Sequence, residues 1–181
     1  MASHPRPAPD VILRDLARDD IPTINAWRQD RFVTDPLGAP PRHISLDVDL
    51  AWFDEYLRRR GTDVRCVICV DGDAAPAGMV SLTGIHPVHR SAEFHIMLGR
   101  ADLSGRGIGT AATRQMLRHG FLDLNLWRIY LSVLAGNHAA IRVYEKAGFR
   151  TEGQARGAAF KNGRYEDTVL MAVLRDEFTV Q

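Results

Sequence analysis

The chain has 181 residues, of which 45% are hydrophobic and 25% charged, and its formal net charge is +1 at pH 7. This length and composition predict one globular domain with a sizeable core rather than a disordered or fibrous protein. The near-zero net charge gives no reason to expect a nucleic-acid partner or a membrane surface, and no apolar run is long enough to cross a bilayer. Residues 1–9 lack the apolar core of a secretion signal, so we expect them to be a disordered tail before a single cytoplasmic domain at 10–181.

The first half of the chain combines two amphipathic segments with several β-branched runs. The expected elements are, in chain order, a strand at 11–16, a helix from about Asp20, a proline-rich loop at 35–41, a helix at 46–60 and strands near 64–71, 77–86 and 90–98. In the last of these strands apolar residues alternate with Glu93 and His95, so one face of the strand holds ionisable groups.

A glycine-rich turn at 104–112 ends this meander and opens a helix. Its glycines let the backbone bend sharply and approach a ligand closely. The N–H groups of the first helical turn have no intrahelical partner and lie at the positive end of the helix dipole. Since Arg106 adds a cation, the turn predicts a site for a phosphate-bearing ligand.

The second half of the chain alternates helices and strands, so the sequence predicts a mixed α/β domain. The expected elements are a helix at 107–122, a strand at 128–134, a helix at 137–147 and strands near 149–154 and 168–174, with a loop at 156–166 that contains Lys161, Asn162 and Gly163.

Three kinds of glycine loop compete for the turn. A Walker loop requires a lysine after the last glycine, where this chain has Thr110. Residues 107–112 match the dinucleotide pattern G-x-G-x-x-A, but that pattern belongs in the first βαβ unit of a parallel sheet, whereas this turn follows a meander. A turn without a ligand is the third alternative. Three alternating glycines beside Arg106 favour a ligand.

A second motif identifies the ligand by resemblance. Residues 136–149 read Gly-Asn-His-Ala-Ala-Ile-Arg-Val-Tyr-Glu-Lys-Ala-Gly-Phe. This segment, one helix after Gly-Arg-Gly-Ile-Gly-Thr, resembles the GCN5-related N-acetyltransferase (GNAT) family, and the likeness covers residues 10–175. Within the family, the chain is similar to the group with ribosomal-protein-alanine and spermidine N-acetyltransferases. The resemblance implies a mixed, mostly antiparallel sheet with a splayed strand pair, flanked by about four helices.

The resemblance also implies how acetyl-CoA, the acyl donor, is held. The pyrophosphate is expected on the glycine turn, the pantetheine arm along the edge of the strand at 96–98, and an asparagine on the other side of the arm. The implied cofactor-binding residues are Ile96, Met97, Leu98, Arg106, Gly107, Ile108, Gly109, Thr110, Asn137 and Lys146.

Direct transfer to an amine requires a base for the ammonium and an acid for the leaving thiolate. The resemblance assigns Tyr144 as general acid. Glu93 is the candidate base, acting through water, or else an electrostatic hold on the cationic acceptor, and His95 is a weaker candidate base. We expect no metal, because no carboxylate or cysteine completes a set with His86 and His89.

The acceptor is expected to be a primary amine, either a small molecule such as a polyamine or an antibiotic, or a protein N-terminus. Its site is expected to draw on the first two helices, the final strands and residues 156–166. Candidate contacts are Phe32, Asp35, Trp52, His95 and Tyr165. A homodimer is compatible with the sequence. The alternatives are a catalytically silent acyl-CoA sensor and a dinucleotide-dependent oxidoreductase.

Overall fold

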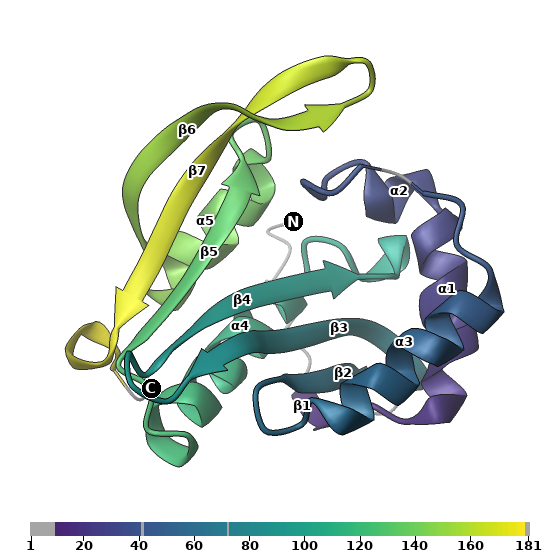
Figure 1. Cartoon of the computed structure of the whole chain (residues 1–181), viewed down its shortest axis with the longest axis horizontal. Coiled ribbons are helices and arrows are strands. Elements are labelled where there is room, and N and C mark those ends of the chain that lie inside the picture. The colour runs from purple at the N-terminus through teal and green to yellow at the C-terminus, as the bar shows by residue number, and fades with distance from the viewer. Residues whose placement is uncertain (1–9, 41, 72, 180–181) are drawn as a thin grey trace, which may run out of the picture.

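A seven-stranded sheet organises the chain (Figure 1). The computed structural model describes residues 10–40, 42–71 and 73–179. The strand order is β1-β2-β3-β4-β5-β7-β6. The strands are β1 Val11–Asp15, β2 Val64–Val70, β3 Asp73–His86, β4 Ser91–Leu98, β5 Arg128–Leu134, β6 Arg150–Lys161 and β7 Arg164–Leu174. The helices are α1 Ile21–Gln29, α2 Arg31–Thr34, α3 Leu46–Arg58, α4 Ile108–Arg118 and α5 His138–Ala147, with a π turn at His119–Asp123 after α4.

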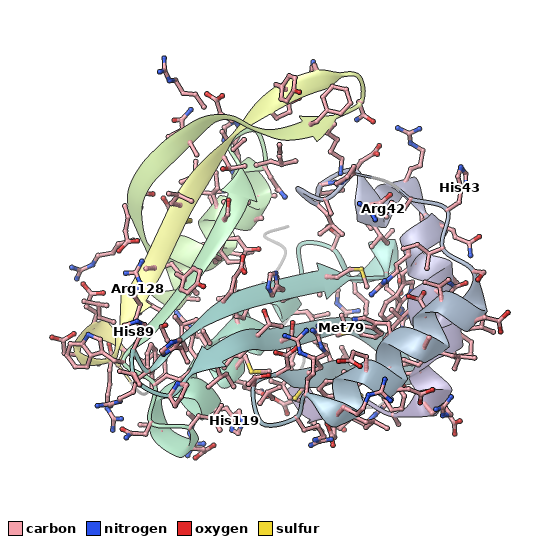
Figure 2. The ribbon with its side chains drawn as sticks, viewed as in Figure 1. Arg42, His43, Met79, His89, His119 and Arg128 are labelled. Atoms are coloured by element: carbon pink, nitrogen blue, oxygen red, sulfur yellow. The ribbon has the colours of Figure 1, made fainter. Side chains whose placement is uncertain are left out.

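The sheet has helices on both faces, and each face has its own apolar core. Helices α4 and α5 pack on one face around a core that includes Phe94, Ile108 and Met116. Helices α1 and α3 cover the other face, where Phe53 packs with Met79, whose place on β3 Figure 2 labels. Four of the five α-helices in the described part of the chain are those expected, and the four-residue α2 is the addition. The predicted α/β fold is confirmed.

Strands β4 and β5 form the splayed pair. They run parallel and pair only through Ser91–Arg128, Ala92–Ile129 and Glu93–Tyr130. The other strand pairs in the described chain are antiparallel. Beyond Glu93 the two strands diverge (Figure 1), so the β4 edge from Phe94 onward is not paired with β5.

The predicted loop at 156–166 is wrong. Strand β6 continues to Lys161 and β7 begins at Arg164, so the segment forms the end of a long antiparallel hairpin. The hairpin turns at Asn162 and Gly163, whose φ angles are 50° and 81°. Two consecutive left-handed residues make the tight turn that suits the twist of a β-hairpin, and Asn-Gly is the dipeptide that favours it.

Candidate active site

The glycine turn enters α4 through two left-handed residues. Gly105 has a φ of +73° and Gly107, the N-cap of α4, has a φ of +84°. Both angles are in the region that glycine adopts without steric penalty. The first hydrogen bond within the helix runs from the Ala111 N–H to the Gly107 carbonyl. The N–H groups before this bond, at the start of an eleven-residue helix, have no partner within the helix and are available to a ligand.

These groups fit a pyrophosphate. The N–H groups of Ile108, Gly109 and Thr110 precede the first intrahelical bond, at the positive end of the α4 dipole. Arg106 is half-buried beside them. The structure thus brings five of the predicted cofactor residues, 106–110, together on one turn.

Replacing Gly107 with Ala is expected to raise the Kd for acetyl-CoA by roughly 5- to 30-fold, because a left-handed conformation costs an L-residue about 1–2 kcal/mol. Gly109→Ala is the matched control. A Cβ at Gly109 would meet Leu98 Cδ1 at 3.5 Å and a Val143 methyl at 3.6 Å, which are ordinary contacts on the side of the core. Isothermal titration of both variants with acetyl-CoA checks the expectation, and equal losses in the two would contradict it.

Tyr144 lies on α5, in the core between the sheet and α4. Its side chain is 8% exposed. Its ring meets Phe94 of β4 edge-on at a centroid distance of 6.0 Å and an interplanar angle of 82°, and lies 5.8 Å from the Phe149 ring. Burial raises the pKa of Tyr144 to about 12. The phenol is therefore protonated at neutral pH, as a general acid must be before it acts.

Glu93 and His95 lie on the opposite face of β4. Side chains alternate along the strand, so Phe94 faces the core of α4 and α5 while Glu93, His95 and Met97 face α1 and α3. Glu93 Oε2 lies 3.7 Å from His95 Nε2, and both side chains are partly exposed. The candidate base and the candidate acid therefore approach the free edge of β4 from opposite sides.

Thr83 of β3 orients His95, a contact that the sequence did not predict. Its Oγ1 lies 3.0 Å from His95 Nε2, the nitrogen nearest Glu93. Desolvation by the surrounding sheet lowers the pKa of His95 below its ordinary 6.5, against the opposing effect of the Glu93 carboxylate. His95 is therefore neutral at pH 7 and able to accept a proton.

Asn137 and Lys146 occupy opposite ends of α5. The Asn137 side chain caps the helix by accepting from the Ala140 N–H at 3.1 Å, and its Nδ2 donates to the Pro36 carbonyl at 3.0 Å. Lys146 is exposed near the C-terminal end, where its carbonyl accepts from Arg114 Nη2 at 2.7 Å. Lys146 also lines a surface hollow with Arg114, Gln115 and Arg118 of α4, and its role in binding acetyl-CoA stays a prediction.

Three of the predicted acceptor contacts lie on two neighbouring segments. Phe32 on α2 is half-exposed, and Asp35 follows the same helix. Tyr165 is exposed on β7 at the end of the hairpin, with its ring 5.1 Å from that of Phe160. Trp52 is separate from them: it packs on the core of α1 and α3. Its ring is flanked by the guanidinium groups of Arg28 and Arg65 at 4.9 and 5.0 Å.

Lys161, which the sequence predicts in the loop at 156–166, is a further residue that no sequence pattern indicated. The side chain is buried, and its Nζ donates to carbonyls of the segment after α2. Its partners are more than a hundred residues away in the chain, so no local pattern could have revealed them.

Two further observations concern metal binding and membrane insertion. Among residues 10–40, 42–71 and 73–179, no three His, Cys, Asp or Glu side chains are grouped so that they could hold a metal ion. None of the helices described is both long and apolar enough for a membrane span.

A splayed parallel pair, a glycine turn opening α4 and a buried tyrosine on the next helix define an acetyl-CoA-dependent N-acetyltransferase of the GNAT class. The chain belongs to this family, because the family model for the acetyltransferase (GNAT) domain matches residues 10–150. The resemblance seen in the two sequence motifs is thereby confirmed, and acetyl-CoA rather than a dinucleotide is the ligand.

Three relatives of the chain are named as N-acetyltransferases. The spermidine N(1)-acetyltransferase of Escherichia coli K12 is 31% identical over 175 residues, which cover 96% of this chain and 91% of that protein. The Vibrio cholerae spermidine N(1)-acetyltransferase is 38% identical over 168 residues, 93% of this chain and 95% of that protein. A putative ribosomal N-acetyltransferase of Bacillus subtilis is 34% identical over 147 residues, 81% and 76% of the two chains.

The fold also matches a solved complex. The crystal structure of Vibrio cholerae spermidine N-acetyltransferase with CoA and spermine superposes with a TM-score of 0.85 at 30% identity, covering 92% of this chain and 96% of that one.

Proposed function

We propose that this N-acetyltransferase acetylates a primary amine of a polyamine, with Tyr144 as general acid and Glu93 as general base. The observation that carries the proposal is the divergence of β4 and β5 beyond Glu93, with Tyr144 on one face of β4 and Glu93 on the other. The relatives from Escherichia coli and Vibrio cholerae, named for spermidine, support a polyamine as the acceptor.

The acyl donor fits the described residues. The N–H groups that follow Gly107 bind the pyrophosphate, and the β4 edge at Ile96–Leu98 offers its main-chain groups to the pantetheine amides as an added strand would. One N–H of this edge is then available to the thioester oxygen. When bound, acetyl-CoA supplies an activated acetyl group.

Two residues handle the protons. Glu93, through a water molecule, removes one proton from the ammonium of the acceptor, so that the neutral amine attacks the thioester carbon. As the C–S bond breaks, the nitrogen loses its second proton to water and becomes the amide nitrogen. Tyr144 donates its phenolic proton to the leaving sulfur. Because burial raises the pKa of the phenol, the proton is still bound to the oxygen when the C–S bond breaks. Because the acid and the base lie on opposite faces of β4, each can reach the reacting atoms at the free edge of the strand without crossing to the other face.

The acceptor approaches from the α1 and α3 side of β4, past Phe32, Asp35 and Tyr165. Carboxylates at Asp35 and Glu93 suit a polycationic amine. A protein N-terminus is the second candidate, supported by the likeness to the putative ribosomal enzyme of Bacillus subtilis. A cytoplasmic location and a homodimer belong to this proposal as well.

Thiol release from acetyl-CoA across a panel of acceptors tests the proposal. The panel contains spermidine, spermine, an aminoglycoside, amino acids and short peptides with a free N-terminus. We expect the highest kcat/KM with a polyamine. A higher kcat/KM with a peptide would indicate a protein N-terminus as the acceptor instead of a polyamine. Tight binding of acetyl-CoA, without thiol release in the presence of any acceptor, would favour a sensor.

A further inference from the structure

Lys161 is a buried cation at the end of an exposed hairpin. Only 3% of the residue is accessible, whereas Phe160 and Tyr165 beside it are 52% and 73% exposed. The chain contains two lysines, and the other, Lys146, is exposed. A lysine is rarely buried to this extent unless its ammonium has partners.

Those partners are backbone carbonyl groups of one distant segment. Nζ donates to the carbonyls of Thr34 and Leu37, and to that of Ala39 at 3.3 Å. An ammonium has three N–H donors, so these three bonds use them all. No carboxylate in the described chain is within ion-pairing distance of Nζ. We call Lys161 and these three carbonyls the carbonyl clamp.

A second side chain holds the same segment from α5. Asn137 Nδ2 donates to the Pro36 carbonyl at 3.0 Å while its Oδ1 caps the helix. Four carbonyls between residues 34 and 39 are thus held by two side chains from outside the segment. One of these two side chains, that of Asn137, caps the start of α5, the helix that carries Tyr144.

The segment at 34–39 lies between the parts of the chain that are proposed to contact the acceptor. It continues from α2 and reaches across to the end of β5 and the tip of the β6–β7 hairpin (Figure 1). Asp35, a proposed acceptor contact, is at its beginning, Phe32 precedes it on α2, and Tyr165 is on the hairpin that supplies Lys161. The clamp therefore joins the two parts of the chain that are proposed to contact the acceptor.

We propose that Lys161 is a positioning residue for acetyl transfer, which fixes the 34–39 segment as the acceptor-side wall of the active site. The inference rests on the proposed acceptor site. Apart from the last residue of α2, the segment has no regular secondary structure, and a turn bond runs within it from the Leu37 N–H to the Thr34 carbonyl at 3.2 Å. Without the ammonium, the Leu37 and Ala39 carbonyls lose this donor and the Thr34 carbonyl keeps only the turn bond. Ordering the segment then has to be achieved when the acceptor binds.

Lys161→Met tests this, because methionine keeps an unbranched apolar stem and removes the donors. We expect kcat/KM for the acceptor to fall about tenfold or more, mainly through KM, since acceptor placement rather than proton transfer is disturbed. The Kd for acetyl-CoA, whose proposed pyrophosphate site is on α4, should change less than about twofold. Arg164→Met is the matched control: Arg164 pairs with Lys161 in the hairpin register, but its side chain is 76% exposed.

An unchanged acceptor KM in the Lys161→Met variant would overturn the proposal, as would equal losses in KM for the acceptor and Kd for acetyl-CoA. The latter pattern indicates general damage to the fold.

A second measurement uses the unaltered chain and needs no acceptor. Trinitrobenzenesulfonate is applied and the two lysines are followed by peptide mapping, with exposed Lys146 as the internal reference. We expect Lys161 to react at least about tenfold more slowly, in proportion to the population in which the clamp is open. Equal reactivity would overturn the clamp even if the acceptor assignment were correct, and a panel without any acetylated amine would refute the proposed function but not the clamp itself.

Discussion

Replacing Tyr144 with Phe is expected to lower kcat by about 100- to 1,000-fold, the range typical of losing a positioned general acid. The substitution removes only the hydroxyl, so the ring contacts with Phe94 and Phe149 persist and the core should stay intact. The proton for the leaving sulfur then has to come from water. Since the pyrophosphate and pantetheine contacts are elsewhere, the Kd for acetyl-CoA should stay within about twofold.

Steady-state thiol release and isothermal titration with acetyl-CoA measure the two quantities. Tyr56→Phe is the control, because Tyr56 is also buried but is in the core of α1 and α3. Its hydroxyl bonds to the Arg65 N–H, so that variant should lose thermal stability and keep its kcat. Unchanged turnover in Tyr144→Phe would remove this residue from the mechanism.

The pH dependence supplies an independent check on Tyr144. Its pKa is raised to about 12 by burial, so the acid form persists as the pH rises well above 10. Between pH 8 and 10, deprotonation of Tyr144 should therefore cause no decline in kcat. The parent enzyme and Tyr144→Phe should show the same pH dependence in this range. A descending limb in that range, absent from the variant, would place the pKa of the phenol lower than its burial implies.

Much of the site could be predicted because its residues carry local signals. Glycines that must adopt positive φ precede α4, Asn137 caps α5, and Gly148 ends that helix in the left-handed conformation. Each of these depends on a few neighbouring residues. The alternation of apolar and ionisable residues along β4 likewise places Glu93 and His95 on the face opposite Phe94, and a period of two residues can be recognised within one strand.

The remaining features depend on contacts between distant parts of the chain. Lys161 and Thr34 are 127 residues apart, and nothing near either residue indicates the other. Trp52 has the aromatic character of a binding-site wall, but its helix turns it toward the core of α1 and α3. The hairpin is a different case, because Asn162-Gly163 is a local signal that favours a tight turn between two strands over a loop.

Replacing Glu93 with Gln is expected to lower kcat by about 100-fold, at the lower end of what a general base contributes. Glutamine keeps the size and the polar end of the side chain but cannot take a proton from the ammonium. Steady-state values of kcat and kcat/KM for the parent enzyme and the variant measure the effect.

The same variant separates the two roles that a carboxylate at this position can have. If Glu93 only holds a cationic acceptor, Glu93→Gln raises KM while kcat is preserved, because binding is lost equally in the ground state and the transition state. That outcome would contradict general-base catalysis by Glu93.

His95→Gln, made in parallel, tests the neighbouring imidazole. Because His95 shares its Nε2 with Thr83 and is only 3.7 Å from Glu93, its loss should cost no more than about tenfold if its role is to orient the carboxylate and water. A larger loss than in Glu93→Gln would make His95 the base. Its acidic limb would then fall below pH 6.5, since desolvation lowers the pKa of His95 from that value. An acidic limb that persists in Glu93→Gln and is lost in His95→Gln therefore identifies His95 as the group that removes the proton.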